Sequence, residues 1–158
     1  MVLTVHPEHL QVICNHGMSA YPEECCGLLV GRLFNGGKIL VEVWPAENAW
    51  SAEASLAVSG EEEFSKKRRY EIPAQFMFEA QRKARDLDLS IIGIYHSHPD
   101  NPAIPSECDR QYAWPQYSYI IVSVQQGKAQ DLQSWSLDDA HQFQPEEILT
   151  SEPTAVEQ

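Results

Sequence analysis

Two histidines one residue apart close an apolar run in the stretch GIYHSHPDNPAIPSECDR, residues 93–110. Side chains two apart on an extended strand point the same way, so His96 and His98 can reach one ion while Ser97 points away. Prolines stiffen the following loop, which can bring Asp109 back to the same place. Two imidazoles and one carboxylate leave a fourth tetrahedral position for water, as in catalytic zinc sites. This pattern predicts a zinc site.

A simpler interpretation of the same residues is a solvated strand end followed by a proline-rich loop. A lone pair of histidines would not decide between the two. The pair is followed by Pro99 and then, at fixed distances, by Ser106 and Asp109, which makes a metal site the more specific interpretation.

Hydrolysis by activated water also needs a base that takes a proton and passes it to the leaving group. The candidates are Glu23 and Glu24 in the upstream stretch YPEECCGLLVG, where carboxylates open an otherwise apolar strand. From the residues alone the two compete for this role, and solvation at a strand start explains both more simply.

The segment Glu24–Leu29 resembles the Glu-x-Cys-Gly-x-Leu element of the JAMM (MPN-plus) zinc metalloproteases. HSHPDNPAIPSECD is similar to the His-x-His-Pro-x(6)-Ser-x-x-Asp motif of that family, and the resemblance extends from the first helix to about Leu137. It implies one zinc ion per chain, a general acid/base and a serine that helps to hold the oxyanion. By position, the implied zinc ligands are His96, His98 and Asp109, and the implied catalytic residues are Glu24 and Ser106.

The same resemblance implies cleavage after the C-terminal Gly-Gly of a ubiquitin-like or sulfur-carrier protein, as in the stand-alone prokaryotic members. The alternative is a non-catalytic MPN scaffold, but such members have lost ligands and this chain keeps them all. HSHPD also matches the start of the metallo-β-lactamase-type signature His-x-His-x-Asp-His, yet residue 101 is Asn and only His141 remains downstream. The His-x-Glu and Pro-Cys-x-x-Cys motifs of zinc nucleoside deaminases are absent.

Alternating helices and strands are expected to position these residues. The patterns predict helices over Pro7–His16, ended by Gly17, and over about Pro73–Leu87, with Phe76, Ala80, Ala84 and Leu87 on its buried stripe. They predict a hairpin around Asn35-Gly36 and later strands over residues 90–95, 117–124 and 130–137. Residues 48–69 are expected to form a long loop.

These elements favour an α/β (α+β) class with helices packed on one layered sheet. The family resemblance implies the MPN fold, a curved, mixed and mostly antiparallel sheet flanked by helices, like that of cytidine deaminases. Residues 1–143 are expected to form the single domain. Residues 144–158 are acidic and polar without periodicity, and they predict a flexible tail.

The composition restricts the partners. A net charge of −12 over 158 residues argues against binding to nucleic acid or to an anionic membrane. The chain shows no membrane span and no secretory signal at its N-terminus. Its four cysteines, two of them adjacent, do not form a disulfide framework, so we expect a reducing cytoplasm.

A few further residues could be mistaken for functional ones. His6 and His9 are expected to be exposed on the first helix rather than to bind metal. Cys108, beside Asp109, is expected to be a spectator, and Cys25 and Cys26 to pack in the sheet. The only basic run, Lys66–Arg69, lies in the long loop and could gather an acidic partner near the cleft.

Overall fold

The structure is a computed structural model that describes residues 2–50 and 69–151. In these residues the elements follow one another as β1 (Val2–Val5), α1 (Pro7–Ala20), β2 (Cys26–Phe34), β3 (Gly37–Ala46), α3 (Ala74–Asp86), β4 (Ser90–Pro99), α4 (Glu107–Gln111), β5 (Ser118–Gln125), β6 (Lys128–Leu137) and β7 (Phe143–Thr150).

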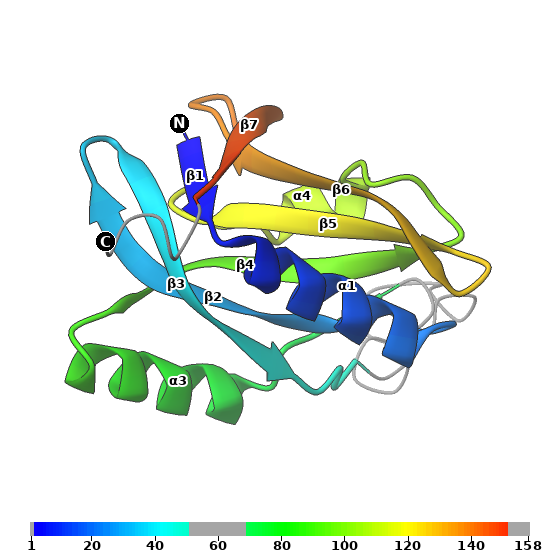
Figure 1. Ribbon diagram of the computed structural model, residues 1–158, viewed down its shortest axis with the longest axis horizontal. Coiled ribbons are helices and arrows are strands. Elements are labelled where there is room, and N and C mark those ends of the chain that lie inside the picture. The colour runs from blue at the N-terminus through cyan, green and yellow to red at the C-terminus, as the bar shows by residue number, and fades with distance from the viewer. Residues whose placement is uncertain (1, 51–68, 152–158) are drawn as a thin grey trace.

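The strands form one mixed sheet that closes into a barrel in the order β1-β3-β2-β4-β5-β6-β7 (Figure 1). β1 runs parallel to both β3 and β7, and β4 runs parallel to β5, whereas the other neighbours are antiparallel. The predicted mixed sheet with flanking helices is confirmed. Its closure by β1 was not predicted, because four residues carry too little pattern to indicate a strand.

The predicted hairpin between β2 and β3 is confirmed. Asn35 and Gly36 have φ values of 51° and 78°, which is the left-handed backbone that a two-residue type I′ turn requires. The turn sets the register as far as the pair of Gly31 with Leu40. A β-bulge between Val30 and Gly31 then shifts the register by one residue, so that Cys26 pairs with Ala46 at the far end of the two strands. The hairpin therefore fixes the end of β2 next to which Glu23 and Glu24 lie.

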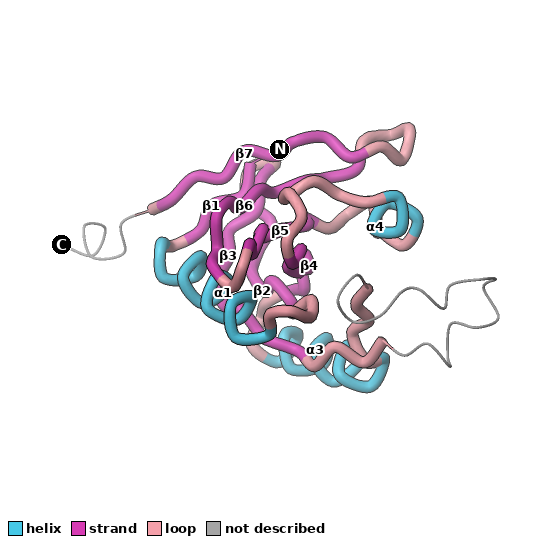
Figure 2. Tube along the Cα trace, turned by 90° about the vertical axis from the view of Figure 1, so that its right-hand side faces the viewer, coloured by secondary structure: helices cyan, strands magenta, loops and turns pink. Residues whose placement is uncertain are grey.

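Alternate residues of the strands belong to two apolar clusters on opposite faces of the sheet. One cluster joins α1 to Leu29, Tyr95 and Ile120 through Ile13. The other joins α3 to the neighbouring strand residues, and it includes Leu28, Val30, Ala80, Ala84, Ile94 and Tyr119. α1 and α3 therefore cover opposite faces, and Figure 2 shows α4 lying apart from both.

The first helix is longer than predicted, since α1 continues through Gly17 to Ala20. Gly17 lies against the sheet: a Cβ atom there would be 3.1 Å from a methyl group of Val124 and 3.4 Å from the Cβ of Ser97. The prediction that Gly17 ends the helix is wrong, because this glycine serves close packing against β4 and β5 rather than termination.

The prediction of a flexible tail from residue 144 is wrong for the described part of that segment. β7 (Phe143–Thr150) pairs antiparallel with β6 and parallel with β1, so it belongs to the domain. Glu146 is buried within it and accepts a hydrogen bond from Ser134 at 2.7 Å. Pairing with the preceding strand β6 and with β1 at the other end of the chain compensates for the acidic composition. Residues 152–158 lie outside the described residues.

The second predicted helix is confirmed as α3, with Ala80 and Ala84 buried. Leu87 is the C-terminal cap residue and is 45% exposed, so its predicted place on the buried stripe is wrong. Among the described residues, no helix is both long and apolar enough to cross a membrane.

Candidate functional site

β4 presents the two histidines on the face of the sheet that also carries α3. The strand continues through both residues because it pairs with β5 as far as Pro99 and with β2 as far as His96. His96 and His98 are buried on that face. Ser97 lies on the opposite face, where its Oγ accepts a hydrogen bond from the N–H of Cys25 at 2.8 Å. The predicted alternation is confirmed.

Asp109 is brought to the histidines by the start of α4, a short helix that the sequence analysis did not predict. Ser106 is the N-cap residue, and its Oγ accepts a hydrogen bond from the N–H of Asp109 at 3.0 Å. In return the N–H of Ser106 donates to Oδ2 of Asp109 at 2.9 Å. This reciprocal capping box holds the Asp109 carboxylate in one orientation.

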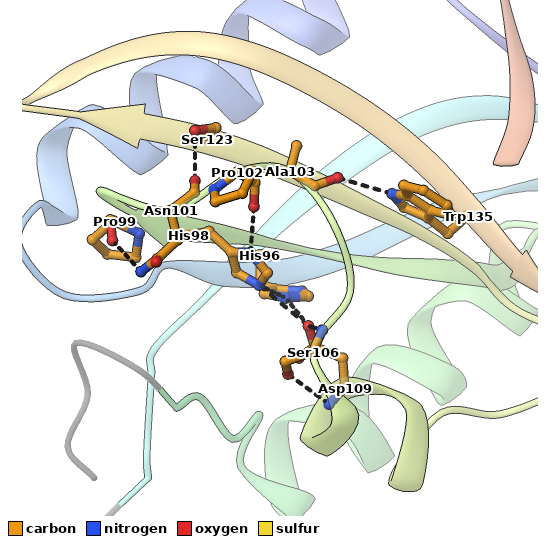
Figure 3. A network of polar contacts seen from close by, with 10 residues as sticks. All are labelled: His96, His98, Pro99, Asn101, Pro102, Ala103, Ser106, Asp109, Ser123 and Trp135. Atoms are coloured by element: carbon orange, nitrogen blue, oxygen red, sulfur yellow. Dashed lines mark hydrogen bonds and ion pairs between the residues drawn. The ribbon is translucent and has the colours of Figure 1, made fainter. Parts of the chain in front are cut away.

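The three side chains form a compact triangle of possible ligand atoms (Figure 3). Nε2 of His96 lies 3.2 Å from Nε2 of His98, and Oδ2 of Asp109 lies 3.3 Å and 3.2 Å from these two nitrogens. Tetrahedral zinc with bonds of about 2.0–2.1 Å places its ligand atoms about 3.3 Å apart. The triangle therefore has the size that a zinc ion requires.

The tautomer of His98 also suits a metal ligand. Nδ1 of His98 lies 2.8 Å from the carbonyl oxygen of Pro102. A carbonyl only accepts, so Nδ1 carries the proton and Nε2 presents its lone pair to the triangle. The loop that carries Pro102 is held from β5 and β6 by two hydrogen bonds, from Ser123 Oγ to Asn101 O at 2.6 Å and from Trp135 Nε1 to Ala103 O at 3.1 Å.

The surroundings favour the protonation states in which these side chains bind a metal. Burial lowers the pKa of His96, which favours the neutral imidazole. Burial alone would raise the pKa of Asp109, but the facing rings of His96 and His98 outweigh this effect, and the pKa lies below its ordinary value. Neutral imidazole and ionised carboxylate are the forms that ligate a metal ion.

The structure separates the two candidate glutamates. Glu24 is buried, with 6% of its surface exposed, whereas Glu23 is exposed. Cys26 pairs with His96, and the N–H of Ser97 donates to the carbonyl of Cys25. Continuing this register places Glu24 level with His98 on the face that carries both histidines.

Two residues beside the triangle were not predicted from the sequence. The ring of Tyr70 stacks on His96 with centroids 4.4 Å apart and an interplanar angle of 22°. Asn48 donates to the carbonyl oxygens of Glu24 and Arg69, both at 3.0 Å. Asn48 is the first residue of the predicted loop of residues 48–69 and Tyr70 directly follows that loop, and no spacing signal in this part of the sequence indicates either residue.

The family of prokaryotic homologs of the JAB domain matches this chain over residues 6–138, which include the triangle, Glu24 and Ser106. The chain belongs to the JAB-domain family. The resemblance drawn from the two motifs is thereby confirmed.

Named relatives of this JAB-domain chain are hydrolases. It is 32% identical to the desampylase of Haloferax volcanii over 106 residues, which cover 65% of the chain and 63% of the desampylase, less than two thirds of that relative. It is 26% identical to the CysO-cysteine peptidase of Mycobacterium tuberculosis over 156 residues, which cover 98% of the chain and 91% of the relative.

The fold is also that of a solved JAB1/MPN domain protein from Archaeoglobus fulgidus. The superposition has a TM-score of 0.54 and covers 94% of this chain and 99% of that protein, at 17% sequence identity. This likeness concerns the fold, and it confirms the predicted MPN architecture.

The other histidines and cysteines of the JAB-domain chain stand outside the triangle. His6 and His9 are half-buried rather than exposed: Nδ1 of His9 accepts from the N–H of His6, so the pair caps α1. None of the four cysteines, all of which lie among the described residues, is in a disulfide, and burial raises the pKa of Cys25 and of Cys26 to about 12. Cys108 is half-buried on α4 and is not part of the group of three. Of the basic run, residues 66–68 lie outside the described residues.

Proposed function

We propose that this JAB-family chain is a zinc-dependent peptidase. It would cleave the peptide or isopeptide bond that follows the C-terminal Gly-Gly of a ubiquitin-like or sulfur-carrier protein. The observation that carries the proposal is the triangle of His96, His98 and Asp109, whose three ligand atoms lie 3.2–3.3 Å apart. Three protein ligands leave a fourth position open, which distinguishes a catalytic zinc site from a closed structural one.

The donor set supports zinc among the divalent metals. Two imidazoles and one carboxylate at tetrahedral spacing suit zinc, whereas magnesium and calcium prefer six or more oxygen ligands. A zinc ion held by these residues supplies Lewis-acid activation of a water molecule and of the substrate carbonyl.

The chain's own residues then divide the remaining tasks. Glu24, buried on the histidine face, takes the proton of the attacking water and delivers it to the departing amine. Oγ of Ser106 accepts from the N–H of Asp109, which leaves its own O–H hydrogen available to donate to the oxygen on which negative charge develops. The loop and helix that carry Pro102 and Asp109 keep the ligands in place.

The substrate class is supported by the names of the relatives, a desampylase and a CysO-cysteine peptidase. Both names fit the release of a small carrier protein from a group attached to it, and the second name gives that group as cysteine. A non-catalytic scaffold is the competing function, and the complete set of ligand and catalytic side chains argues against it. We further propose that the protein works in the cytoplasm, where its four thiols stay reduced.

The test incubates the zinc-loaded protein with a panel of Gly-Gly-tailed carriers, each joined through its C-terminus to cysteine or to a lysine side chain. Products are identified by mass. We expect release of a carrier that ends in Gly-Gly, and we expect chelator to abolish the release. A protein that holds about one zinc per chain but releases no carrier from any conjugate would favour the scaffold function instead.

A further inference from the structure

We infer that Asn48 is a positioning residue of this site. Its side chain holds both the main chain of Glu24 and the main chain on either side of Tyr70 in place through hydrogen bonds. The structural part of the inference stands on hydrogen bonds alone. Its catalytic consequence rests on the proposed function, since it assigns Glu24 the role of general acid/base.

The side-chain amide of Asn48 uses its whole hydrogen-bonding capacity. Nδ2 donates to the carbonyl oxygens of Glu24 and Arg69, both at 3.0 Å. Oδ1 accepts from the N–H groups of Trp50 at 3.0 Å and Glu71 at 3.1 Å. An asparagine amide has two donor hydrogens and two acceptor lone pairs, so all four are satisfied. A flipped amide would set its oxygen against two carbonyl oxygens, so these partners fix its orientation.

Two of these bonds lie on either side of Tyr70. The carbonyl of Arg69 and the N–H of Glu71 are both held by Asn48, and the N–H of Ala49 adds a bond of 2.8 Å to the carbonyl of Glu71. The main chain of Tyr70 is therefore fixed before and after the residue, and its ring is held against His96 at 4.4 Å.

The remaining bond holds Glu24, which lies two residues before the start of β2. Next to the last paired residue of β2, the N–H of Cys25 donates to Ser97 Oγ and the carbonyl of Cys25 accepts from the N–H of Ser97. The bond from Asn48 adds a contact to the carbonyl oxygen of the preceding residue, Glu24. A displacement of about 1 Å in a reacting group can cost on the order of 10²-fold in rate, and this bond opposes such a displacement of Glu24.

The two segments that Asn48 joins both border the triangle. The ring of Tyr70 stacks on His96, and the register of β2 against β4 places Glu24 level with His98 on the face that carries both histidines. Asn48 thus connects the main chain of the proposed acid/base with the main chain that holds this ring.

A double-mutant cycle tests the catalytic consequence. In the zinc-loaded protein, Asn48→Ala should lower the turnover of a Gly-Gly-tailed carrier by about 10–100-fold, as for other residues that orient an active group, while the zinc content stays the same. In the Glu24→Gln background the same substitution should have little further effect, because the group that it positions no longer transfers protons. An equal factor in both backgrounds would overturn the inference in favour of a general structural role.

Two further variants distinguish a loss of positioning from a loss of folding. Asn48→Asp keeps the acceptor oxygen for Trp50 and Glu71 but loses both donors, so it should reproduce the kinetic effect if Asn48→Ala does not fold. Ser134→Ala is the matched control, because it removes a buried side-chain hydrogen bond of 2.7 Å to Glu146 on the sheet face opposite the triangle. It should lower the melting temperature without changing turnover.

A readout independent of catalysis is the proton NMR signal of the His96 ring, identified by its loss in His96→Gln. The stacked Tyr70 ring shifts this signal, and Tyr70→Leu gives its position without the ring. Asn48→Ala and Asn48→Asp should move the signal toward that position, and Ser134→Ala should not. If the signal moves but no carrier is cleaved by the unaltered protein, the proposed function fails and the positioning stands. If cleavage occurs and neither Asn48 variant changes the signal or the turnover, the positioning fails.

Discussion

Replacing Glu24 by glutamine separates metal binding from proton transfer in the proposed mechanism. Glutamine has the size and hydrogen-bonding reach of glutamate but cannot carry a proton between water and amine. The three ligand atoms of the triangle come from other residues, so Glu24→Gln should keep its zinc. It should also keep its melting temperature, because the backbone of residue 24 retains its bond to Asn48.

The structure indicates how large the loss should be. A positioned general acid/base contributes on the order of 10²–10⁴ in rate, which is about 2.7–5.4 kcal/mol of barrier. Only 6% of the surface of Glu24 is exposed, so little bulk water or buffer can act in its place. We therefore expect a loss on the order of 10³ or more in turnover, with the affinity for the Gly-Gly-tailed carrier nearly unchanged.

The assay is single-turnover cleavage of a carrier conjugate by zinc-loaded protein, with zinc content and carrier binding measured on the same samples. Glu23→Gln is the matched control, since it makes the same chemical change at the neighbouring exposed residue and should be nearly silent. If the two substitutions exchanged these outcomes, Glu23 would be the catalytic residue and the register argument for Glu24 would be refuted. If Glu24→Gln lost its zinc, Glu24 would be a ligand.

Three further predictions follow from particular contacts. Substituting any one of His96, His98 or Asp109 by alanine should strongly reduce bound zinc measured by elemental analysis, and full occupancy in all three variants would contradict the ligand assignment. Ser106→Ala should lower the free energy of unfolding by about 1 kcal/mol through loss of the α4 cap and should lower turnover; Ser106→Asp, which can still cap, should restore stability but not turnover. Gly27→Ala should lower the free energy of unfolding, measured in urea, by about 1–3 kcal/mol, because the new Cβ would lie 2.2 Å from the fully buried ring of Tyr95. An unchanged unfolding midpoint would mean that this ring can move.

The role suggested for the basic run Lys66–Arg69 stays a prediction, because all of it except Arg69 lies outside the described residues. Charge steering changes encounter rates and fades with salt. Neutralising the four residues should therefore slow the capture of a protein substrate, mainly at low salt, and leave a short peptide substrate unaffected. An equal effect on both substrates would indicate a loss of stability instead.

The sequence by itself determined the family and the elements with a strong local pattern. The hairpin turn at Asn35-Gly36 follows from two residues that tolerate left-handed backbone, and the alternation of His96, Ser97 and His98 follows from the period of a strand. Such features depend on neighbours in the chain, so spacing is enough to predict them. The reciprocal bonds of Ser106 and Asp109 are equally local, since they join residues three apart, but the short helix α4 that they start was not predicted.

Only the tertiary structure decided the features that depend on distant partners. β7 forms because β1 and β6 lie on either side of it, and Gly17 stays helical because the sheet packs against it. The family resemblance already implied Glu24 rather than Glu23, and the pairing of β2 with β4, some 70 residues further along the chain, explains why Glu24 is the buried one of the two. Asn48 and Tyr70 carry no signal in the sequence because their partners belong to other segments, and a hydrogen bond or a ring contact across the fold leaves no periodicity in either one.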